Sequence, residues 1–444
     1  MATTTDTSTY KFNHTMIRVK DPKESVKFYE FLGLKQIRKL QFPEAKFDLY
    51  FLAYDSPSAV SAGRSVFDRE GVIELTHNYG TESDPDYKIN NGNTDPHRGF
   101  GHTCISVDNL QAACQRIEDA GYKFQKKLTD GRMKHIAFAL DPDGYWVEII
   151  GQKPLEATAD VTTTDVSTYR MNHTMLRVKD SEKSLKFYQE VMGMTLLRTA
   201  PSPAAKFTNF FLGYAAGNVS TPVHEADEGV TSTAYREGVL ELTWNYGTES
   251  DPEFSYHDGN KEPQGFGHIC VIVDDLDAAC ARFESLNVSW KKRLTDGRMK
   301  NVAFVLDPDG YWIEIVQNER LAGKENFDHA GVELVANTGG LEALLPRVVF
   351  LTIHTPLLAT TLNFLGEAQL RSMKPTAQAD EEPETAETVT PGDAGQDGQT
   401  CLLCKAAAIA AVGASSSNPI GATVLPNDII EGHVSGKNIY IVRL

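Results

Sequence analysis

The chain has 444 residues, of which 41% are hydrophobic and 23% charged. This composition is typical of soluble globular proteins and excludes a wholly disordered chain or a coiled coil, while the length allows two or three domains. The 43 Lys and Arg residues against 60 Asp and Glu residues give a formal net charge of −17. Charge of this sign disfavours nucleic acid and anionic membranes as partners, so neither is expected.

The beginning of the chain, MATTTDTSTYKFNHT, has neither a basic segment nor an apolar core, so no secretory signal is predicted. The longest apolar stretch, 344–365, contains Arg347 and His354, which disfavour a membrane span. We therefore expect a cytoplasmic protein whose cysteines are reduced core thiols. Four of the six cysteines lie in segments that look folded: Cys104, Cys114, Cys270 and Cys280.

An internal repeat organises the chain. The segment NHTMIRVKD at 13–21 returns as NHTMLRVKD at 172–180. Five further motifs recur in the same order: EGVIELT (as EGVLELT), NYGTESDP, GFGH, LTDGRMK and DPDGYW. The repeat is much longer than a solenoid unit, so it predicts two duplicated domains, 10–152 and 169–320. The second copy carries a few extra residues, which we expect near 214–236.

Within each copy the hydrophobic pattern predicts strand, helix and three strands, twice over. In the first copy this gives a strand at HTMIRVK, a helix after Asp21-Pro22 that ends at Gly33, and three strands, at 35–40, 46–54 and 71–78. The order then repeats from the strand GHTCISV through the helix NLQAACQRIEDAG to strands near 122–128, 135–140 and 145–150. The pattern predicts an α+β fold with two βαβββ modules per domain.

The remaining part of the chain, 321–444, lies outside the repeat. Residues 374–400 are rich in Pro, Glu and Thr, and Val389 is their one large apolar residue. Such a segment buries too little apolar surface to offset the entropy of ordering it. A disordered C-terminal tail is therefore predicted.

Four positions per domain interrupt otherwise apolar strands with ligand-type side chains. They are His14, Glu74, His102 and Glu148 in the first copy, and His173, Glu241, His268 and Glu314 in the second. A single histidine on a strand is usually structural, and a single glutamate often lies at a sheet edge. Two imidazoles and two carboxylates that recur together instead indicate a divalent first-row metal, with zinc a natural choice, because buried carboxylates require a cation or protons.

Further polar residues follow the candidate ligands along the same strands. Arg18 lies four residues after His14, and Asn78 four residues after Glu74, about 13 Å along one strand face. This spacing suits an extended anionic ligand that reacts at the metal end. Lys126, Lys127 and Arg132 precede the last strands, where an anion clamp and a solvated basic loop are equally good interpretations.

These residues resemble the glyoxalase I (lactoylglutathione lyase) family in its fused two-domain form, within the vicinal oxygen chelate superfamily. The resemblance spans about 10–320, through motifs such as ELTHNYGTE, RGFGH and DPDGYWVEI. It implies two tandem glyoxalase domains that form an internal pseudo-dimer within a monomer. It also implies a carbon–sulfur lyase that isomerises the hemithioacetal of methylglyoxal and glutathione to S-lactoylglutathione, by metal-assisted proton transfer through an enediolate.

The resemblance also implies two metal sites, each shared between the domains. One site is His14, Glu74, His268 and Glu314, and the other is His173, Glu241, His102 and Glu148. The last glutamate of each site, Glu314 or Glu148, is implied as the catalytic base. One zinc ion per site is favoured by the long segment between Glu74 and His102, while nickel or another divalent metal remains open.

The family's glutathione contacts map to side chains of both domains. They are Arg18, Asn78, Lys292 and Arg298 for the first site, and Arg177, Asn245, Arg98, Lys126 and Arg132 for the second. The two copies differ at some of these positions. Gln264 stands where Arg98 would be repeated, and the apolar pocket of Phe42, Phe47 and Leu49 becomes Ser202, Phe207 and Asn209. The two sites are therefore not expected to be equivalent.

Two alternatives share the fold. Extradiol-type dioxygenases hold iron with two histidines and one glutamate, and the fourth ligand here argues against them. Metal-free binding proteins have no need of eight ligand-type residues. Fold alone does not separate these functions, so the site residues have to decide.

Overall fold

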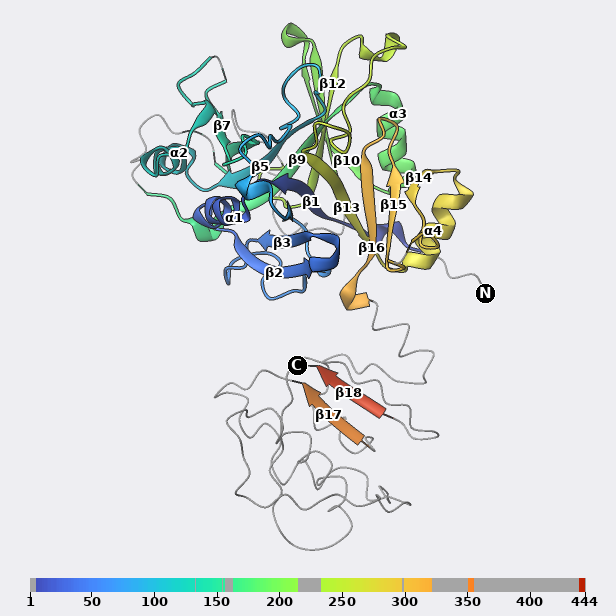
Figure 1. Cartoon of the computed structure of the whole chain (residues 1–444). Coiled ribbons are helices and arrows are strands. Elements are labelled where there is room, and N and C mark those ends of the chain that lie inside the picture. Colours follow the sequence, from blue (N-terminus) through green and yellow to red (C-terminus); the bar gives the residue numbers. More distant parts are fainter. Residues whose placement is uncertain are drawn as a thin grey trace, which may run out of the picture. The chain divides into compact units, whose positions relative to one another are not determined.

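The computed structural model describes residues 5–131, 133–153, 155, 163–214, 233–297, 299–321, 350–354 and 439–443. The first domain has the predicted order of two βαβββ modules (Figure 1). Its first module consists of β1 (Lys11–Val19), α1 (Pro22–Phe31), β2 (Lys35–Phe42), β3 (Phe47–Ala53) and β4 (Val72–Asn78). Its second module consists of β5 (Phe100–Val107), α2 (Leu110–Asp119), β6 (Phe124–Lys126), β7 (Ile136–Leu140) and β8 (Trp146–Gly151).

The second domain repeats this order, which confirms the predicted α+β fold of duplicated modules. Its first module consists of β9 (Arg170–Val178), α3 (Ser181–Lys186), β10 (Thr195–Ser202), β11 (Phe207–Gly213) and β12 (Val239–Asn245). Its second consists of β13 (Phe266–Val273), α4 (Leu276–Ser285), β14 (Ser289–Lys292), β15 (Val302–Leu306) and β16 (Trp312–Gln317). The extra residues expected near 214–236 fall mostly at 215–232, outside the described residues.

Each of the α-helices α1 to α4 begins at a side-chain cap. The carboxylates of Asp21, Asp180 and Asp275 and the amide oxygen of Asn109 accept hydrogen bonds from backbone N–H groups of the first turn. Such caps satisfy donors that have no partner within the helix. They fix where the chain turns from the first strand of each module into its helix.

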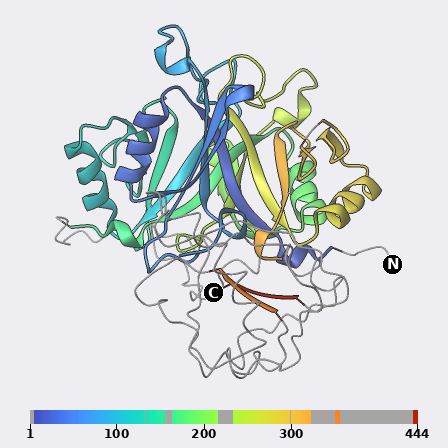
Figure 2. The same cartoon turned by 60° about the horizontal axis from the view of Figure 1, so that its bottom comes forward.

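Two eight-stranded mixed sheets form the core, and each takes one module from each domain. One sheet has the order β14-β15-β16-β13-β1-β4-β3-β2, and the other β10-β11-β12-β9-β5-β8-β7-β6. The domains join where β1 pairs antiparallel with β13, and β9 antiparallel with β5. Viewed as in Figure 2, the helices of the first domain (blue and teal) lie on one side of the sheets and those of the second (green and yellow) on the other.

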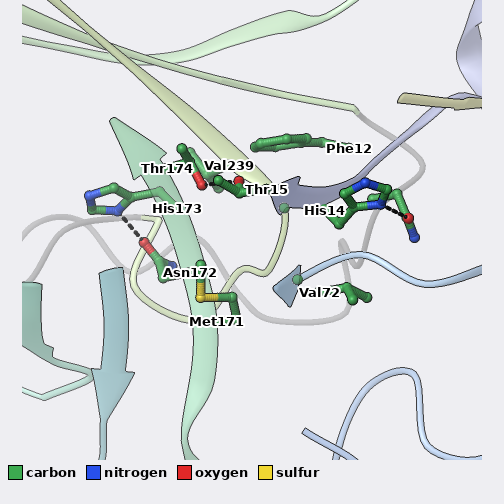
Figure 3. A pocket seen from close by; sticks show the side chains of 12 residues that line it. Phe12, His14, Thr15, Val72, Met171, Asn172, His173, Thr174 and Val239 are labelled. Carbon is green, nitrogen blue, oxygen red and sulfur yellow. Dashed lines mark hydrogen bonds between the residues drawn. The ribbon is translucent and has the colours of Figure 1, made fainter. Parts of the chain in front are cut away.

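The seam between the sheets brings β1 and β9 together. The hydroxyl groups of Thr15 and Thr174 are hydrogen-bonded there at 2.5 Å. Figure 3 shows this pair between the side chains of His14 and His173, which lie on opposite sides of it. Equivalent residues of the two copies therefore meet at the seam, as expected for an internal pseudo-dimer.

The tail beyond Ala322 forms a separate unit. Of its residues the structure describes two short strands, β17 (Phe350–His354) and β18 (Ile439–Arg443), which pair in parallel. The prediction of disorder at 374–400 lies outside the described residues. In the described part of the chain, every helix is too short or too polar to cross a membrane.

Two glutamates are buried at the seam, and each packs against the glycine that follows the other in the chain. Glu70 and Glu237, just before β4 and β12, are each 6% exposed. Glu70 lies so close to Gly238 that a Cβ added there would be 2.9 Å from the Cβ of Glu70, and Gly71 meets Glu237 in the same way at 3.1 Å. Burial raises the pKa of Glu70 to about 8 and that of Glu237 to about 7. Five basic side chains oppose this rise: Lys11, Arg64, Arg69, Arg170 and Arg236.

Replacing both residues, as Glu70→Gln with Glu237→Gln, should flatten the pH dependence of the unfolding free energy between about pH 4.3 and 8. In the unfolded chain these carboxyls ionise near pH 4.3, whereas the folded chain keeps them protonated to higher pH. The folded state thus binds more protons in this window, and the native chain loses stability as pH rises, by at most about 1.4 kcal/mol per pH unit for each carboxyl. Urea unfolding at pH 5 and pH 8 measures the difference. An unchanged pH dependence in the variant would assign it to other groups.

Candidate metal centres

Four adjacent strands of the first sheet each contribute one ligand-type side chain to a single cluster. In the order β16, β13, β1 and β4 these are Glu314, His268, His14 and Glu74. One nitrogen or oxygen atom from each residue lies within 4.8 Å of the other three. The Nε2 atom of His14 lies 3.1 Å from Glu74 Oε2, 3.2 Å from Glu314 Oε2 and 3.2 Å from His268 Nε2. We call this group the first cluster.

The second sheet holds a matching group, the second cluster. Strands β12, β9, β5 and β8 contribute Glu241, His173, His102 and Glu148. The Nε2 atom of His173 lies 2.8 Å from Glu241 Oε2, 3.1 Å from Glu148 Oε2 and 3.3 Å from His102 Nε2. The structure thus brings together the eight predicted ligands in the two predicted groups of four, each with two residues from each domain.

An asparagine orients one imidazole in each cluster. Nδ1 of His14 lies 2.7 Å from Asn13 Oδ1, and the Asn13 amide in turn donates to the backbone carbonyls of Val66 and Arg69. Because the amide nitrogen is used in this way, the amide oxygen faces Nδ1 and accepts a hydrogen bond from its N–H group. The lone pair of Nε2 is then directed into the cluster, as a metal-binding histidine requires.

The same arrangement recurs in the second cluster, where Nδ1 of His173 lies 2.8 Å from Asn172 Oδ1 (Figure 3). The sequence analysis did not single out either asparagine. The repeated triplet NHT, in which each precedes its histidine, was the available signal.

Burial makes the charges of the clusters costly unless they compensate one another. Burial by itself would raise the pKa of Glu314, but the imidazoles of His268 and His14 outweigh it and hold that pKa well below its usual range. His102 and His173 do the same for Glu148. With a protonated imidazole beside it, the buried carboxylate of Glu314 or Glu148 stays ionised. An imidazole that binds a metal is neutral, so the metal ion then has to supply the positive charge. A divalent cation supplies that charge better than protons do, so these donor sets suit one.

The remaining carboxylates have different partners in the two clusters. The hydroxyl of Thr76 donates directly to Glu74 Oε1 at 3.1 Å. In the second cluster the amide of Asn209 donates to Glu241 Oε1, and the hydroxyl of Thr243 donates to Asn209 Oδ1 at 3.0 Å. Leu49 occupies the position of Asn209 beside the first cluster, so the two centres differ next to a candidate ligand.

Comparison with known proteins shows which family has this fold and these sequence motifs. Residues 11–149 and 170–315 match the model of the Glyoxalase/Bleomycin resistance protein/Dioxygenase superfamily. Lactoylglutathione lyase of Schizosaccharomyces pombe is 49% identical over 321 residues, which is 72% of this chain and the whole of that relative. This chain belongs to the lactoylglutathione lyase (glyoxalase I) family. The resemblance seen in the sequence is thereby confirmed.

Two further members of the glyoxalase I family are also similar to this chain over most of its length. Glyoxalase I of Saccharomyces cerevisiae is 48% identical over 326 residues, 71% of this chain and 94% of the relative. The crystal structure of glyoxalase I from Zea mays is 28% identical and matches with a TM-score of 0.50, covering 72% of this chain and 96% of that one.

The arginines predicted to bind glutathione anchor a loop of the opposite domain. The guanidinium of Arg18 donates to the carbonyl of Phe266 at 3.1 Å and to Asn260 Oδ1 at 2.8 Å. Arg177 makes the equivalent bonds to Phe100 and Asn93. Each arginine therefore holds the loop that leads into the strand of a cluster histidine.

The predicted lysines also have backbone partners. Lys126 Nζ donates to the carbonyls of Met133 at 2.6 Å and Ile136 at 2.7 Å. Lys292 repeats this with Met299 and Val302, both at 2.6 Å. These ammonium groups close the loop between β6 and β7, and between β14 and β15. Their predicted neighbours Arg132 and Arg298 lie outside the described residues.

The last predicted substrate contacts differ between the copies. Asn78 ends β4, while Asn245 ends β12 and donates to the hydroxyl of Tyr256 at 2.9 Å. Arg98 pairs with Asp95 at 3.0 Å and is about half exposed. Gln264, at the equivalent position, donates to the carbonyl of Asn260 at 3.2 Å. The Arg98 charge is therefore accessible, whereas the Gln264 side chain carries no charge.

Because each domain carries only two side chains of each cluster, separate domains should bind a divalent ion far more weakly than the whole chain. Two shorter chains, one ending and one beginning in the segment 153–165, would be confirmed as monomers and titrated with Zn²⁺ by calorimetry. Mixing the two should restore tight binding, since strand pairing rebuilds both clusters. A monomeric single domain that binds Zn²⁺ as tightly as the full chain would contradict the shared centres.

Proposed function

We propose that this chain is a lactoylglutathione lyase, which isomerises the hemithioacetal of methylglyoxal and glutathione to S-lactoylglutathione. The observation that carries the proposal is the pair of buried clusters, each with two histidines and two glutamates, in a chain 49% identical to a lactoylglutathione lyase. The fourth ligand-type residue opposes the extradiol dioxygenase alternative, and the eight buried ligand-type side chains oppose a metal-free binding protein.

A divalent metal ion fits both clusters. His14, Glu74, His268 and Glu314 would hold one ion, and His102, Glu148, His173 and Glu241 the other. Two imidazole and two carboxylate donors suit zinc, which we propose, and nickel remains the principal rival. When bound, the ion supplies Lewis-acid polarisation of the substrate oxygens.

The proton transfer itself falls to a carboxylate in each cluster. Glu314 or Glu148 takes the proton from C1 of the hemithioacetal and returns it to C2, so the reaction is redox-neutral. Glu74 and Glu241 are held by Thr76 and Asn209, which restrains their movement. Glu314 and Glu148 are instead hydrogen-bonded by the thiols of Cys270 and Cys104, which are weak donors. This weaker restraint supports Glu314 and Glu148 as the residues that leave their resting position to act as the base.

The glutathione part of the substrate extends along the strands from each cluster. Arg18 with Asn78, and Arg177 with Asn245, lie four residues beyond a cluster residue on the same strand. Arg98 would bind a glutathione carboxylate at the second cluster. Lys126, Arg132, Lys292 and Arg298 complete the proposed contacts from the loops before β7 and β15.

We further propose that the protein is a monomer of the cytosol. The internal pairing of β1 with β13 and of β9 with β5 supports the monomer, because it already joins the surfaces that a single-domain chain would use to pair with a copy. The free thiols of the four described cysteines, three of them buried, support a reducing compartment.

Replacing the proposed bases one at a time should allow the activity of each centre to be measured alone. Glu314→Gln should silence the first cluster and Glu148→Gln the second, and each single variant should keep the activity of the other centre. The double variant should lose about 10²–10⁴-fold in kcat, because neither centre retains its proton carrier. Steady-state assays with methylglyoxal and glutathione test this, with zinc content measured to confirm that the metal stays bound. A double variant with most of its kcat would assign the base elsewhere.

The centre beside Arg98 should bind the glutathione moiety more tightly than the centre beside Gln264. A charge-assisted contact contributes about 1.5–3 kcal/mol, and partial exposure of Arg98 reduces it, so up to about tenfold in KM is expected. Comparing KM for the methylglyoxal hemithioacetal in Glu314→Gln, which retains the Arg98 centre, and Glu148→Gln measures the difference. Equal KM values would show that a neighbour such as Lys261 compensates Gln264.

A further inference from the structure

Two arginines occupy matching positions near the outer edges of the sheets. Arg198 of β10 lies opposite Phe211 of β11, which lies opposite Glu241 of β12. Arg38, Phe51 and Glu74 form the same row in the other sheet. Residues directly opposite one another share a sheet face. Each arginine is therefore on the face that carries a cluster, with its Cα roughly 10 Å from that of the cluster glutamate, two strand spacings away.

Beside the first cluster the arginine charge is neutralised. Arg38 Nη1 lies 2.9 Å from Glu319 Oε1, and both side chains are more than a third exposed. Its guanidinium lies 5.8 Å from the centre of the Phe67 ring, which fills the space in front of Phe51 and His14. Arg38 is thus held at the rim by a carboxylate and kept apart from the cluster by an aromatic ring.

Beside the second cluster, other residues stand at the positions of Glu319 and Phe67. Lys153 stands at the position of Glu319, and Ala234 at that of Phe67. Arg198 lies directly over the Phe211 ring, at 5.3 Å, and that ring contacts the His173 imidazole edge-on at 5.7 Å. Burial lowers the pKa of Arg198, and the carboxylate of Glu241 acts against this. Among the residues that the structure describes, no carboxylate lies within 4 Å of its guanidinium.

The side chains near the two arginines also differ: they are large and apolar beside Arg38, and smaller or more polar at the matching positions beside Arg198. Phe51 belongs to an apolar group with Leu40, Leu49 and Phe67 beside the first cluster. The matching residues beside the second cluster are Ala200, Asn209 and Ala234. The side chains on this wall are thus smaller, and Asn209, whose amide donates to Glu241 Oε1, brings a polar group where the first centre has Leu49. The wall of the second centre therefore suits a polar, negatively charged group.

We propose that the second cluster selects 2-oxoaldehydes whose substituent ends in a carboxylate, with Arg198 as the specificity-determining contact. The inference rests on the proposed function and adds a substrate class to one of its two centres. The guanidinium lies over the Phe211 ring, 5.3 Å from its centre, which restrains it beside the cluster. A guanidinium in this position can form paired hydrogen bonds with a carboxylate. The first centre, with Arg38 paired to Glu319 and an apolar wall, serves neutral and apolar substituents.

Turnover in single-centre variants tests the selection. With the zinc-loaded full chain, Glu314→Gln leaves the second centre active and Glu148→Gln leaves the first. Each would be assayed with the glutathione hemithioacetals of 4,5-dioxopentanoate and of neutral 2-oxohexanal. The ratio of kcat/KM for the carboxylate over the neutral substrate should be about tenfold higher in the second centre, and higher salt should reduce it. A ratio that is equal in the two centres would overturn the proposal.

Substituting the two arginines provides the matched control. Arg198→Met in the Glu314→Gln background should reduce that ratio about tenfold, and Arg198→Lys should restore part of it. Arg38→Met in the Glu148→Gln background should leave the ratio of the first centre as it was. If Arg198→Met weakens both substrates equally, Arg198 contacts the glutathione moiety or the fold instead, and the proposal is wrong.

A binding measurement separates this inference from the proposed function. Calorimetry of the zinc-loaded chain with S-(4-carboxybenzyl)glutathione and S-benzylglutathione needs no catalysis. Arg198→Met should reduce the preference for the carboxybenzyl compound about tenfold, whereas Arg38→Met should not. If that holds while Glu314→Gln turns over neither hemithioacetal, the recognition stands and the catalytic assignment of the second centre fails. If the preference is absent from the native chain or unaffected by Arg198→Met, the recognition itself is refuted.

Discussion

The antiparallel pairing of β1 with β13, and of β9 with β5, determines where every candidate ligand lies. In the first sheet, Met16 is aligned with both His268 and Glu74, and His14 with Cys270, which is aligned with Glu314. A slip of one residue along this pairing would turn the side chains of a whole strand to the opposite face. The two centres therefore depend on the register between domains as much as on the identity of their residues.

The glycines of the GFGH motif allow this register. Gly265 lies against the backbone of Asn90, and a Cβ added to it would come within 1.8 Å of the Asn90 carbonyl oxygen. Gly99 meets the carbonyl of His257 in the same way. Arg18 and Arg177 then fasten these crossing loops through several backbone carbonyls. Loops of one domain thus lie directly beside the histidine strands of the other.

The fold and the eight candidate ligands could be predicted from the sequence because their signals are local and doubled. A histidine at position 14 or a glutamate at position 74 is ambiguous alone, but recurrence in the same strand pattern separates it from a structural residue. The division into two shared groups was different, since it came from resemblance to a family. No periodicity within one strand reveals which distant strand lies beside it.

The contacts that sequence analysis missed join residues far apart in the chain. Arg18 was expected to face a ligand, but its bonds to a loop some 240 residues away could not be inferred from spacing. Lys126 was an expected anion contact, and its ammonium also closes its own loop. Arg38 and Arg198 occupy matching positions in the repeat, and the structure shows that Arg38 pairs with Glu319, where the other copy has Lys153. The effect of a substitution between the copies can be inferred only when the residues around it in the structure are known.

The composition of the sheets has a consequence for how such a chain can change over generations. The unit that is duplicated or exchanged by recombination is the domain, whereas the unit that builds a centre is one module from each domain. Replacing the first domain by that of a relative would therefore create two hybrid centres and leave neither parental centre intact. Substitutions within a single module, such as those at 198, 209 and 234, alter one centre and spare the other. Divergence between the centres is thus expected to accumulate module by module.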